Sequence, residues 1–219
     1  MVVQAVTVID EYLRTMEEVG RGLPRAEIAR AVDVLFNCWQ REGTVFTAGN
    51  GGSASTATHL ACDLAKATIV PGRRRLKTVC LVDNIPLNSA WANDSGFASL
   101  FAEQLEPWLT ERDVLVALSV HGGSGEGEAG PWSQNLAAAV ALTRQRGARV
   151  IGLSGFGGGD LARSADVCIV VPIDSEPLGT PVVESWHVAL HHLLCTALRR
   201  RICQTCELCI GLCAAFATG

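Results

Sequence analysis

The sequence lacks an apolar run long enough to cross a membrane, and its N-terminus lacks the basic start and apolar core of a signal peptide. It also lacks an excess of basic charge, since 18 lysines and arginines are set against 22 aspartates and glutamates. An acidic balance without a broad basic face disfavours nucleic acid as a ligand. We therefore expect a cytoplasmic protein whose partners include neither nucleic acid nor membrane.

Charged residues are also scarce, at 18%, whereas apolar residues make up 48% of the 219 positions. This composition excludes an intrinsically disordered chain, and the length suffices to bury a core without disulfides. Histidine is rare, with five residues, but cysteine is not, with nine. In a cytoplasmic protein these cysteines are expected to be reduced.

Hydrophobic periodicity divides the chain into three regions, which we take as 1–42, 43–201 and 202–219. The first contains two amphipathic stripes separated by Gly20 and Gly22, which predict a pair of helices. Because this pair precedes every predicted strand, its apolar faces are available to the core or to another subunit. We expect it to serve oligomerisation.

The middle region predicts an α/β fold. Continuous β-branched runs indicate five buried strands, at 44–47, 78–82, 114–118, 150–153 and 167–171. Helical patterns alternate with these runs, including one over 96–108, and a last helix spans about 181–200. Strands that alternate with helices predict a doubly wound, five-stranded parallel sheet.

A glycine-rich turn, Asn50-Gly51-Gly52-Ser53, directly follows the first predicted strand. A strand, a glycine turn and a helix start can cradle an anion, because backbone N–H groups and the helix dipole point at the ligand. The pattern is neither a dinucleotide fingerprint nor a P-loop. An ordinary turn with a serine N-cap explains it equally well when it is taken alone.

A second polar turn follows the third strand and contains Ser119, His121 and Ser124. The carboxyl ends of parallel strands lie at one edge of the sheet, where open α/β sheets bind ligands. Two such turns at the same edge favour a phosphate site.

Four of the five histidines fall on two predicted helices, each with a carboxylate. His59 and Asp63 are four residues apart on the first of these helices and share a face. The last helix carries Glu184 and the other three histidines, His187, His191 and His192. Helical geometry aligns Glu184, His187 and His191, with His192 about 80° away from Glu184. Two histidines and two carboxylates suit Zn²⁺ or another divalent first-row metal.

Taken together, five motifs resemble those of the phosphoheptose isomerases, which belong to the sugar isomerase (SIS) domain superfamily. They are Gly49-Asn50-Gly51-Gly52-Ser53, His59-x-x-x-Asp63, Asn93-Asp94-Ser95-Gly96-Phe97, Ser119-x-x-Gly122-x-Ser124 and Glu184-x-x-His187-x-x-x-x-His192. The resemblance implies the SIS fold and the conversion of sedoheptulose 7-phosphate to D-glycero-D-manno-heptose 7-phosphate. It also implies Zn²⁺ and a homotetramer with active sites at subunit interfaces.

The resemblance assigns roles to individual residues. It implies a metal and catalytic cluster of His59, Asp63, Glu184 and His192, and so prefers His192 to His191. For the reaction through an enediol we expect Asp63 or Glu184 to be the base at carbon and His192 the acid at oxygen. The expected substrate-binding residues combine the two turns with a substrate-facing loop: Asn50, Gly51, Gly52, Ser53, Asn93, Asp94, Ser119, His121 and Ser124.

The chain also departs from the family pattern. Asp63 stands where a glutamate is typical, Glu184 where a glutamine is usual, and Val120 and His121 replace hydroxyl residues of the phosphate turn. The segment 126–134 is longer than usual. These departures leave two alternatives: an isomerase of another long-chain ketose phosphate in a specialised pathway, or a non-catalytic SIS module that binds a phosphosugar or a protein.

The last region contains Cys203, Cys206, Cys209 and Cys213, in the spacing C-x₂-C-x₂-C-x₃-C. This spacing is typical of an iron–sulfur run and also permits zinc, but it equally fits an apolar helix stripe of reduced cysteines. The other five cysteines are expected in the core: Cys38, Cys62, Cys80, Cys168 and Cys195.

Overall fold

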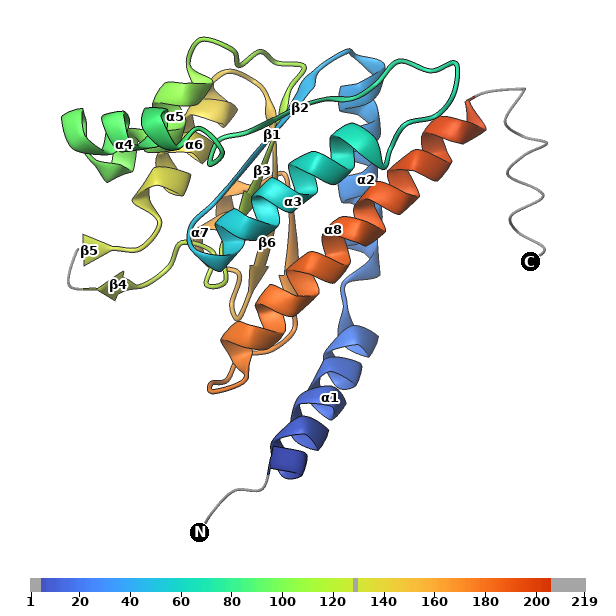
Figure 1. Ribbon diagram of the computed structural model, residues 1–219, viewed down its shortest axis with the longest axis vertical. Helices are drawn as coiled ribbons and strands as arrows, with labels where there is room; N and C mark the ends of the chain where they lie inside the picture. Colours follow the sequence, from blue (N-terminus) through green and yellow to red (C-terminus); the bar gives the residue numbers. More distant parts are fainter. Residues whose placement is uncertain (1–4, 128–129, 206–219) are drawn as a thin grey trace.

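A computed structural model describes residues 5–127 and 130–205. Its centre is a parallel sheet in the order β2-β1-β3-β6-β7 (Figure 1). The strands are β1 (Thr44–Gly49), β2 (Lys77–Cys80), β3 (Val114–Leu118), β6 (Arg149–Gly155) and β7 (Val167–Val171). The three central strands, β1, β3 and β6, are almost wholly buried, as continuous apolar runs require. The predicted doubly wound five-stranded sheet is confirmed.

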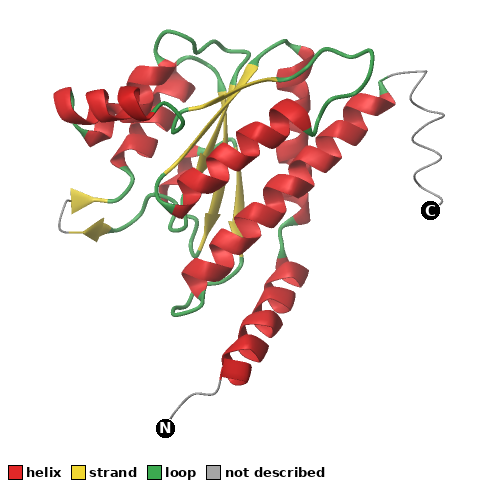
Figure 2. Cartoon of the chain, viewed as in Figure 1, coloured by secondary structure: helices red, strands yellow, loops and turns green. Residues whose placement is uncertain are grey.

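Helices cover both faces of the sheet (Figure 2). One face is packed by α2 (Arg25–Gln40), α3 (Gly52–Lys66) and α8 (Gly179–Gln204). The other face is packed by η1 (Phe97–Ser99), α5 (Leu100–Leu105), α6 (Gln134–Gln145) and α7 (Gly159–Ser164), with α4 (Ile85–Asp94) against η1 and α5. The predicted single helix over 96–108 is therefore wrong, since a 3₁₀ turn that starts after Gly96 (φ 85°) precedes a short α-helix.

The two N-terminal helices have different environments. α2 buries Val32, Leu35 and Trp39 in the same core as α8 and the sheet. α1 (Ala5–Gly22) extends away from the body of the molecule and buries only Val19 (Figure 1). Near its middle, the Tyr12 hydroxyl lies 2.7 Å from Ser185 Oγ and anchors α1 to the start of α8.

The described part of the last region is helical. α8 continues to Gln204, beyond the predicted end near 200, because Ile202 and Cys203 are buried in the core. Cys206, Cys209 and Cys213 lie outside the described residues, so the proposals for this motif stay untested.

The five cysteines expected in the core divide by burial. Cys38 and Cys195 are buried, and Cys80 and Cys168 are partly buried. The prediction for Cys62 is wrong, because its side chain lies on the exposed side of α3.

The longer segment after the second polar turn forms a small antiparallel pair, β4 (Glu126–Gly127) and β5 (Gly130–Pro131). Among the residues described here, no helix is both long and apolar enough to cross a membrane. The cytoplasmic location stays a prediction.

Candidate active site at the carboxyl edge of the sheet

The first glycine turn leads from β1 into α3 and needs glycine for two different reasons, the backbone conformation of Gly51 and the confined space around Gly52. Gly51 has a φ of 55°, which favours glycine, and a Cβ on Gly52 would lie 2.2 Å from Glu184 Oε1. Asn50 and Asn135 form a reciprocal amide pair, with N–O distances of 2.9 and 2.8 Å. This pair connects the turn to the buried start of α6.

The second polar turn follows β3 and folds tightly back on itself. Ser119 Oγ accepts the Gly123 N–H at 3.1 Å, and Gly122 has a φ of 65°. A Cβ on Gly122 would lie 1.9 Å from the Gly158 carbonyl oxygen, so the loop after β6 packs directly on this turn. The glycines are thus required by close backbone approach as well as by conformation.

The two turns enclose a cavity of about 170 Å³. Five predicted substrate or catalytic residues line it: Asn50, Ser53, Ser119, His121 and Glu184. Leu118, Val120, Gly123, Trp132 and Ser133 complete its wall. Three motifs far apart in the sequence therefore meet in one place, because their strands and helices all end or begin at the carboxyl edge of the sheet.

One wall of this cavity is aromatic. The His121 ring lies 5.2 Å from the Trp132 ring and 4.3 Å from the Phe156 ring, measured between centroids. Trp132 directly follows β5, so the longer segment supplies it. An aromatic wall next to hydroxyl groups can hold the carbon face of a sugar while polar groups bind its oxygens.

Five predicted substrate residues do not line the cavity. Gly51 and Gly52 shape the turn behind it, as described above. Ser124, at the end of the second turn, is not in the cavity wall. Asn93 and Asp94 are exposed at the end of α4, where they bond to each other at 2.7 Å.

A second polar group lies where α3 and α8 run side by side (Figure 1). Its members are His59, Asp63, His191 and His192, whose ligand atoms lie within 4.8 Å of one another. Three imidazole nitrogens converge on Asp63 Oδ2: His192 Nδ1 at 2.9 Å, His191 Nε2 at 3.2 Å and His59 Nε2 at 3.8 Å. We call these four residues the His/Asp group.

The members of the His/Asp group differ in exposure. The side chains of His59 and His192 are about half exposed, whereas that of His191 is 0% exposed. Burial lowers the pKa of His191 to about 4, with smaller contributions from His192 and His59, and Asp63 opposes the shift. His191 is therefore neutral at pH 7, with a nitrogen lone pair available.

The donor set of this group fits a divalent first-row metal. Three imidazoles and one carboxylate are ligands that Zn²⁺ takes in four-coordinate sites. Neither ring nitrogen of the buried His191 makes a hydrogen bond within the described part of the chain. Buried polar atoms are normally bonded, and an ion would give these nitrogens a partner.

Glu184 does not belong to the His/Asp group. α3 and α8 run in the same direction, since Gly52 contacts Glu184 and Asp63 contacts His191 and His192. Seven residues along α8 separate Glu184 from His191, which corresponds to about 10 Å. The predicted cluster of His59, Asp63, Glu184 and His192 is thus divided between the His/Asp group and the cavity.

His187 lies between these two places on α8 but joins neither. It is 1% exposed, and burial lowers its pKa to about 4, partly offset by the backbone of Ser154. No ion pair or ring contact links His187 to another described side chain. It is a core histidine.

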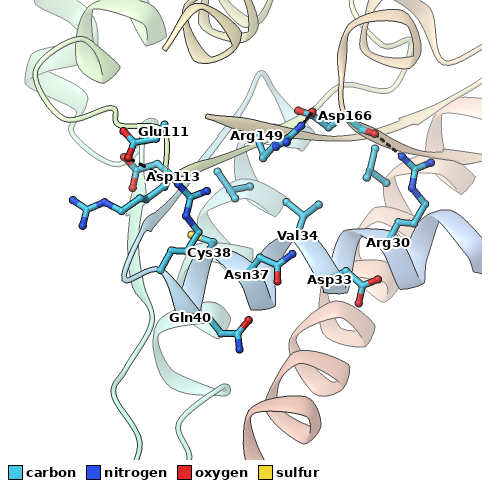
Figure 3. Close-up of a pocket in the computed structure, with 14 residues that line it drawn as sticks. Arg30, Asp33, Val34, Asn37, Cys38, Gln40, Glu111, Asp113, Arg149 and Asp166 are labelled. Carbon is cyan, nitrogen blue, oxygen red and sulfur yellow. Dashed lines mark hydrogen bonds and ion pairs between the residues drawn. The ribbon is translucent and has the colours of Figure 1, made fainter. Parts of the chain in front are cut away.

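A larger cavity, of about 640 Å³, lies at the opposite edge of the sheet, beside α2 (Figure 3). Several of its charged side chains have partners. Arg149 meets Asp166 at 2.5 Å, Arg30 donates to the Asp166 carbonyl oxygen at 2.9 Å, and Arg41 lies 3.9 Å from Glu111. None of the predicted site residues lines this cavity.

Sequence reasoning missed Trp132 at the cavity and Asn135, which holds the cavity residue Asn50, and it gave His191 only a minor role. Asn135 had a weak signal, as an amide residue at the start of a predicted helix. Trp132 was part of the longer segment, whose position in space is set only by the fold. His191 had the correct helical alignment with Glu184, but the family pattern favoured His192.

Comparisons with known proteins agree with this arrangement. The family model of the SIS domain matches residues 9–155. The lincomycin biosynthesis protein LmbN of Streptomyces lincolnensis is 48% identical over 88% of this chain and 69% of its own length. A phosphoheptose isomerase of Rhodospirillum rubrum is 36% identical over 81% of this chain and 87% of its own length.

Solved structures show the same likeness. Phosphoheptose isomerase GmhA from Neisseria gonorrhoeae superimposes with a TM-score of 0.74 at 27% identity, over 88% of this chain and 95% of that chain. A phosphoheptose isomerase from Francisella tularensis gives a TM-score of 0.77 at 25% identity, over 90% of this chain and all of that chain. The chain therefore belongs to the SIS-domain family and is a phosphosugar isomerase related to the phosphoheptose isomerases.

Proposed function

We propose that this isomerase acts on a long-chain ketose phosphate, converting sedoheptulose 7-phosphate to D-glycero-D-manno-heptose 7-phosphate through an enediol. The observation that carries the proposal is the cavity itself, which joins hydroxyls of both polar turns to the Glu184 carboxylate. Hydroxyls and glycine N–H groups suit a phosphate and sugar oxygens, and a carboxylate suits proton transfer at carbon.

The two turns would hold the phosphate. Ser53 is in the first turn of α3, whose N-terminal N–H groups and dipole favour an anion, and Ser119 also lines the cavity. His121 adds an imidazole where the family pattern has a hydroxyl. The Asn50–Asn135 pair fixes the first turn against α6, so that the turn is preformed before substrate binds.

Glu184 is better placed than Asp63 to be the base at carbon. Asp63 Oδ2 is surrounded by three imidazoles, whereas Glu184 borders the cavity and pairs with no other described side chain. A carboxylate there would take a proton from one carbon and return it to its neighbour. His192, the expected acid at oxygen, lies beside Asp63, eight residues or about 12 Å further along α8, so within one subunit it would not act on the same carbon–carbon bond as Glu184.

We further propose that the enzyme holds Zn²⁺ or a similar divalent metal through the His/Asp group. When bound, such an ion polarises the sugar carbonyl and stabilises negative charge on its oxygen. The support is the donor set of His59, Asp63 and His192. The ring nitrogens of the neighbouring His191, which form no hydrogen bond within the described residues, add to it.

A substrate panel tests the proposed function. Metal-analysed protein is incubated with ketose phosphates of five to eight carbons, and the aldose phosphate is measured with a coupled assay. Highest kcat/KM for sedoheptulose 7-phosphate is the expected result. Turnover of none of them by protein that contains metal would overturn the proposal and support the non-catalytic module.

A second candidate is an isomerase of another long-chain ketose phosphate in a specialised pathway. Two observations favour it: the 48% identity to a relative named for lincomycin biosynthesis, and the wall formed by His121 and Trp132. The same panel separates the candidates. A preference for an eight-carbon over a seven-carbon ketose phosphate would select the second.

We also propose a homotetramer with its active sites near subunit interfaces. Support comes from α1, which exposes Val6, Ile9 and Leu13 on one amphipathic helix and is anchored by Tyr12 to the start of α8, close to Glu184. Light scattering tests this: Ile9→Asp with Leu13→Asp should lower the molecular mass in solution. An unchanged mass in that variant would contradict it.

A further inference from the structure

His191 occupies an unusual position for a buried histidine. Its side chain is fully buried, yet its ring lies 4.4 Å from the His59 ring and 4.0 Å from the His192 ring. His59 and His192 are about half exposed, so water can reach their rings, whereas the nitrogens of the buried His191 must be satisfied by the protein or by a ligand. His191 is therefore the member of the cluster that calls for a partner.

The nitrogens of His191 have no other use in the described part of the protein. Neither forms a hydrogen bond, and the same is true of the buried His187, but only His191 lies near a carboxylate, with Nε2 at 3.2 Å from Asp63 Oδ2. Buried polar atoms normally have a partner. A cation held between Asp63 and the imidazoles would satisfy His191 Nε2 without moving α8.

Glu184, by contrast, lies two helical turns away. Its carboxylate rests against Gly52 at the first turn of α3, where the helix dipole favours negative charge. The separation of about 10 Å along α8 exceeds the reach of a ligand bond of about 2 Å to a shared ion, unless the side chain leaves Gly52.

We propose that His191 takes the ligand place that the family pattern gives to residue 184, so that the metal is held by His59, Asp63, His191 and His192. Glu184 is then released from the metal and serves proton transfer in the cavity. This inference rests on the metal of the proposed function, but it concerns which side chains bind it.

The chain offers a matched control. His187 is on the same helix, is equally buried, and lies outside the His/Asp group. His187→Leu and His191→Leu replace a buried imidazole by an apolar side chain in the same way. Only the second should change metal binding if His191 is a ligand.

The experiment measures metal binding directly, without turnover. Zn²⁺ affinity is determined by competition with a chromophoric chelator for the wild type and for His191→Leu, His187→Leu and Glu184→Gln. We expect His191→Leu to weaken Zn²⁺ binding by at least about 100-fold, the upper end of the effect of removing an outer-shell partner. His187→Leu and Glu184→Gln should stay within about threefold.

Co²⁺ substitution gives a second readout. The visible absorption bands of the Co²⁺ protein should change in His191→Leu and remain unchanged in Glu184→Gln, because only the former alters the ligand set. Equal Zn²⁺ affinity in His191→Leu and wild type would overturn the inference. So would loss of Zn²⁺ in Glu184→Gln, or failure of the wild type to bind either metal. A wild type that binds metal through His191 but isomerises no sugar would refute the proposed function alone.

Discussion

Each edge of the sheet has a cavity, and the two cavities differ in whether their charged side chains are already paired within the protein. At the amino edge, beside α2, the cavity is about 640 Å³, and its arginines pair with acidic side chains and a backbone carbonyl. Asp113 there accepts N–H groups of Thr44 and Thr110, both at 2.6 Å. At the carboxyl edge the cavity is about 170 Å³, and Glu184 in its wall pairs with no other side chain that the structure describes.

This difference shows that cavity size is a poor guide to the site in this protein. Paired charges at the amino edge stabilise the ends of strands, and a ligand would have to compete with them. At the carboxyl edge the fold leaves a carboxylate and two serine side chains in the wall of the cavity, whereas the His/Asp group lies farther along α3 and α8. The following predictions test whether the two edges differ in function as they do in structure.

The largest effect should come from removing the unpaired carboxylate. Glu184→Gln keeps the shape of the side chain but removes the proposed base, and should lower kcat by about 10²- to 10⁴-fold. Steady-state kinetics measure this. The matched control at the amino edge is Glu111→Gln, which should leave kcat unchanged; equal losses in both variants would remove the distinction between the edges.

The next effect concerns stability and pH. The pKa of His187 is lowered from 6.5 to about 4 by burial, so the folded protein favours the neutral form. Its stabilising contribution is complete above pH 6.5 and is lost as the pH falls towards 4, because the unfolded chain binds the proton more readily. The full loss is on the order of 3 kcal/mol.

Urea unfolding of metal-free protein between pH 4.5 and 7.5 measures this dependence. In His187→Leu the free energy of unfolding should vary less with pH than in the wild type. Parallel curves for the two proteins would show that His187 is not the buried group that titrates at this edge.

A smaller effect is expected from the second polar turn. Ser119→Ala removes a hydroxyl from the cavity and the acceptor of the Gly123 N–H, at a cost of about 1 kcal/mol in binding. KM should therefore rise by about fivefold to tenfold, with a smaller change in kcat. Thr110→Val removes a buried hydroxyl at the amino edge and should leave KM unchanged, although it loses a hydrogen bond to Asp113.

The smallest effect is expected from Arg149→Ala. Arg149 is mostly exposed, and an exposed ion pair contributes about 0–1 kcal/mol to stability. Thermal unfolding should show a small fall in Tm, and kcat/KM should stay within twofold of the wild type. A tenfold loss of kcat/KM would mean that the larger cavity also takes part in the reaction.

Much of this fold could be predicted because single segments carry the signal. Runs such as that of β3 are buried on both faces and so are continuously apolar, and the turns at Gly51 and Gly122 require positive φ. The two polar turns were assigned to one edge because parallel strands share their direction. The different burial of α1 and α2 could not be predicted, because both helices are amphipathic. Only tertiary packing decides which of the two apolar faces is buried in the core.

The details of the site depended on contacts between distant segments. Asn50 and Asn135 meet across 85 residues, and nothing local to either indicates the pair. The division of the predicted metal cluster depends on how α3 and α8 lie together, which places His191 beside Asp63 and Glu184 beside Gly52. Helical spacing predicts that Glu184 and His191 lie on one stripe of α8. It does not predict that they face different residues of α3, namely Gly52 and Asp63.

Hydrogen exchange of the substrate tests the central claim most directly. Sedoheptulose 7-phosphate is incubated with enzyme in D₂O, and loss of the proton signal at carbon 1 is followed by NMR. The account predicts exchange with the wild type and with Arg149→Ala, and a rate at least about 100-fold lower with Glu184→Gln. Exchange at the wild-type rate in Glu184→Gln would contradict the placement of the proton-transfer base at the carboxyl edge.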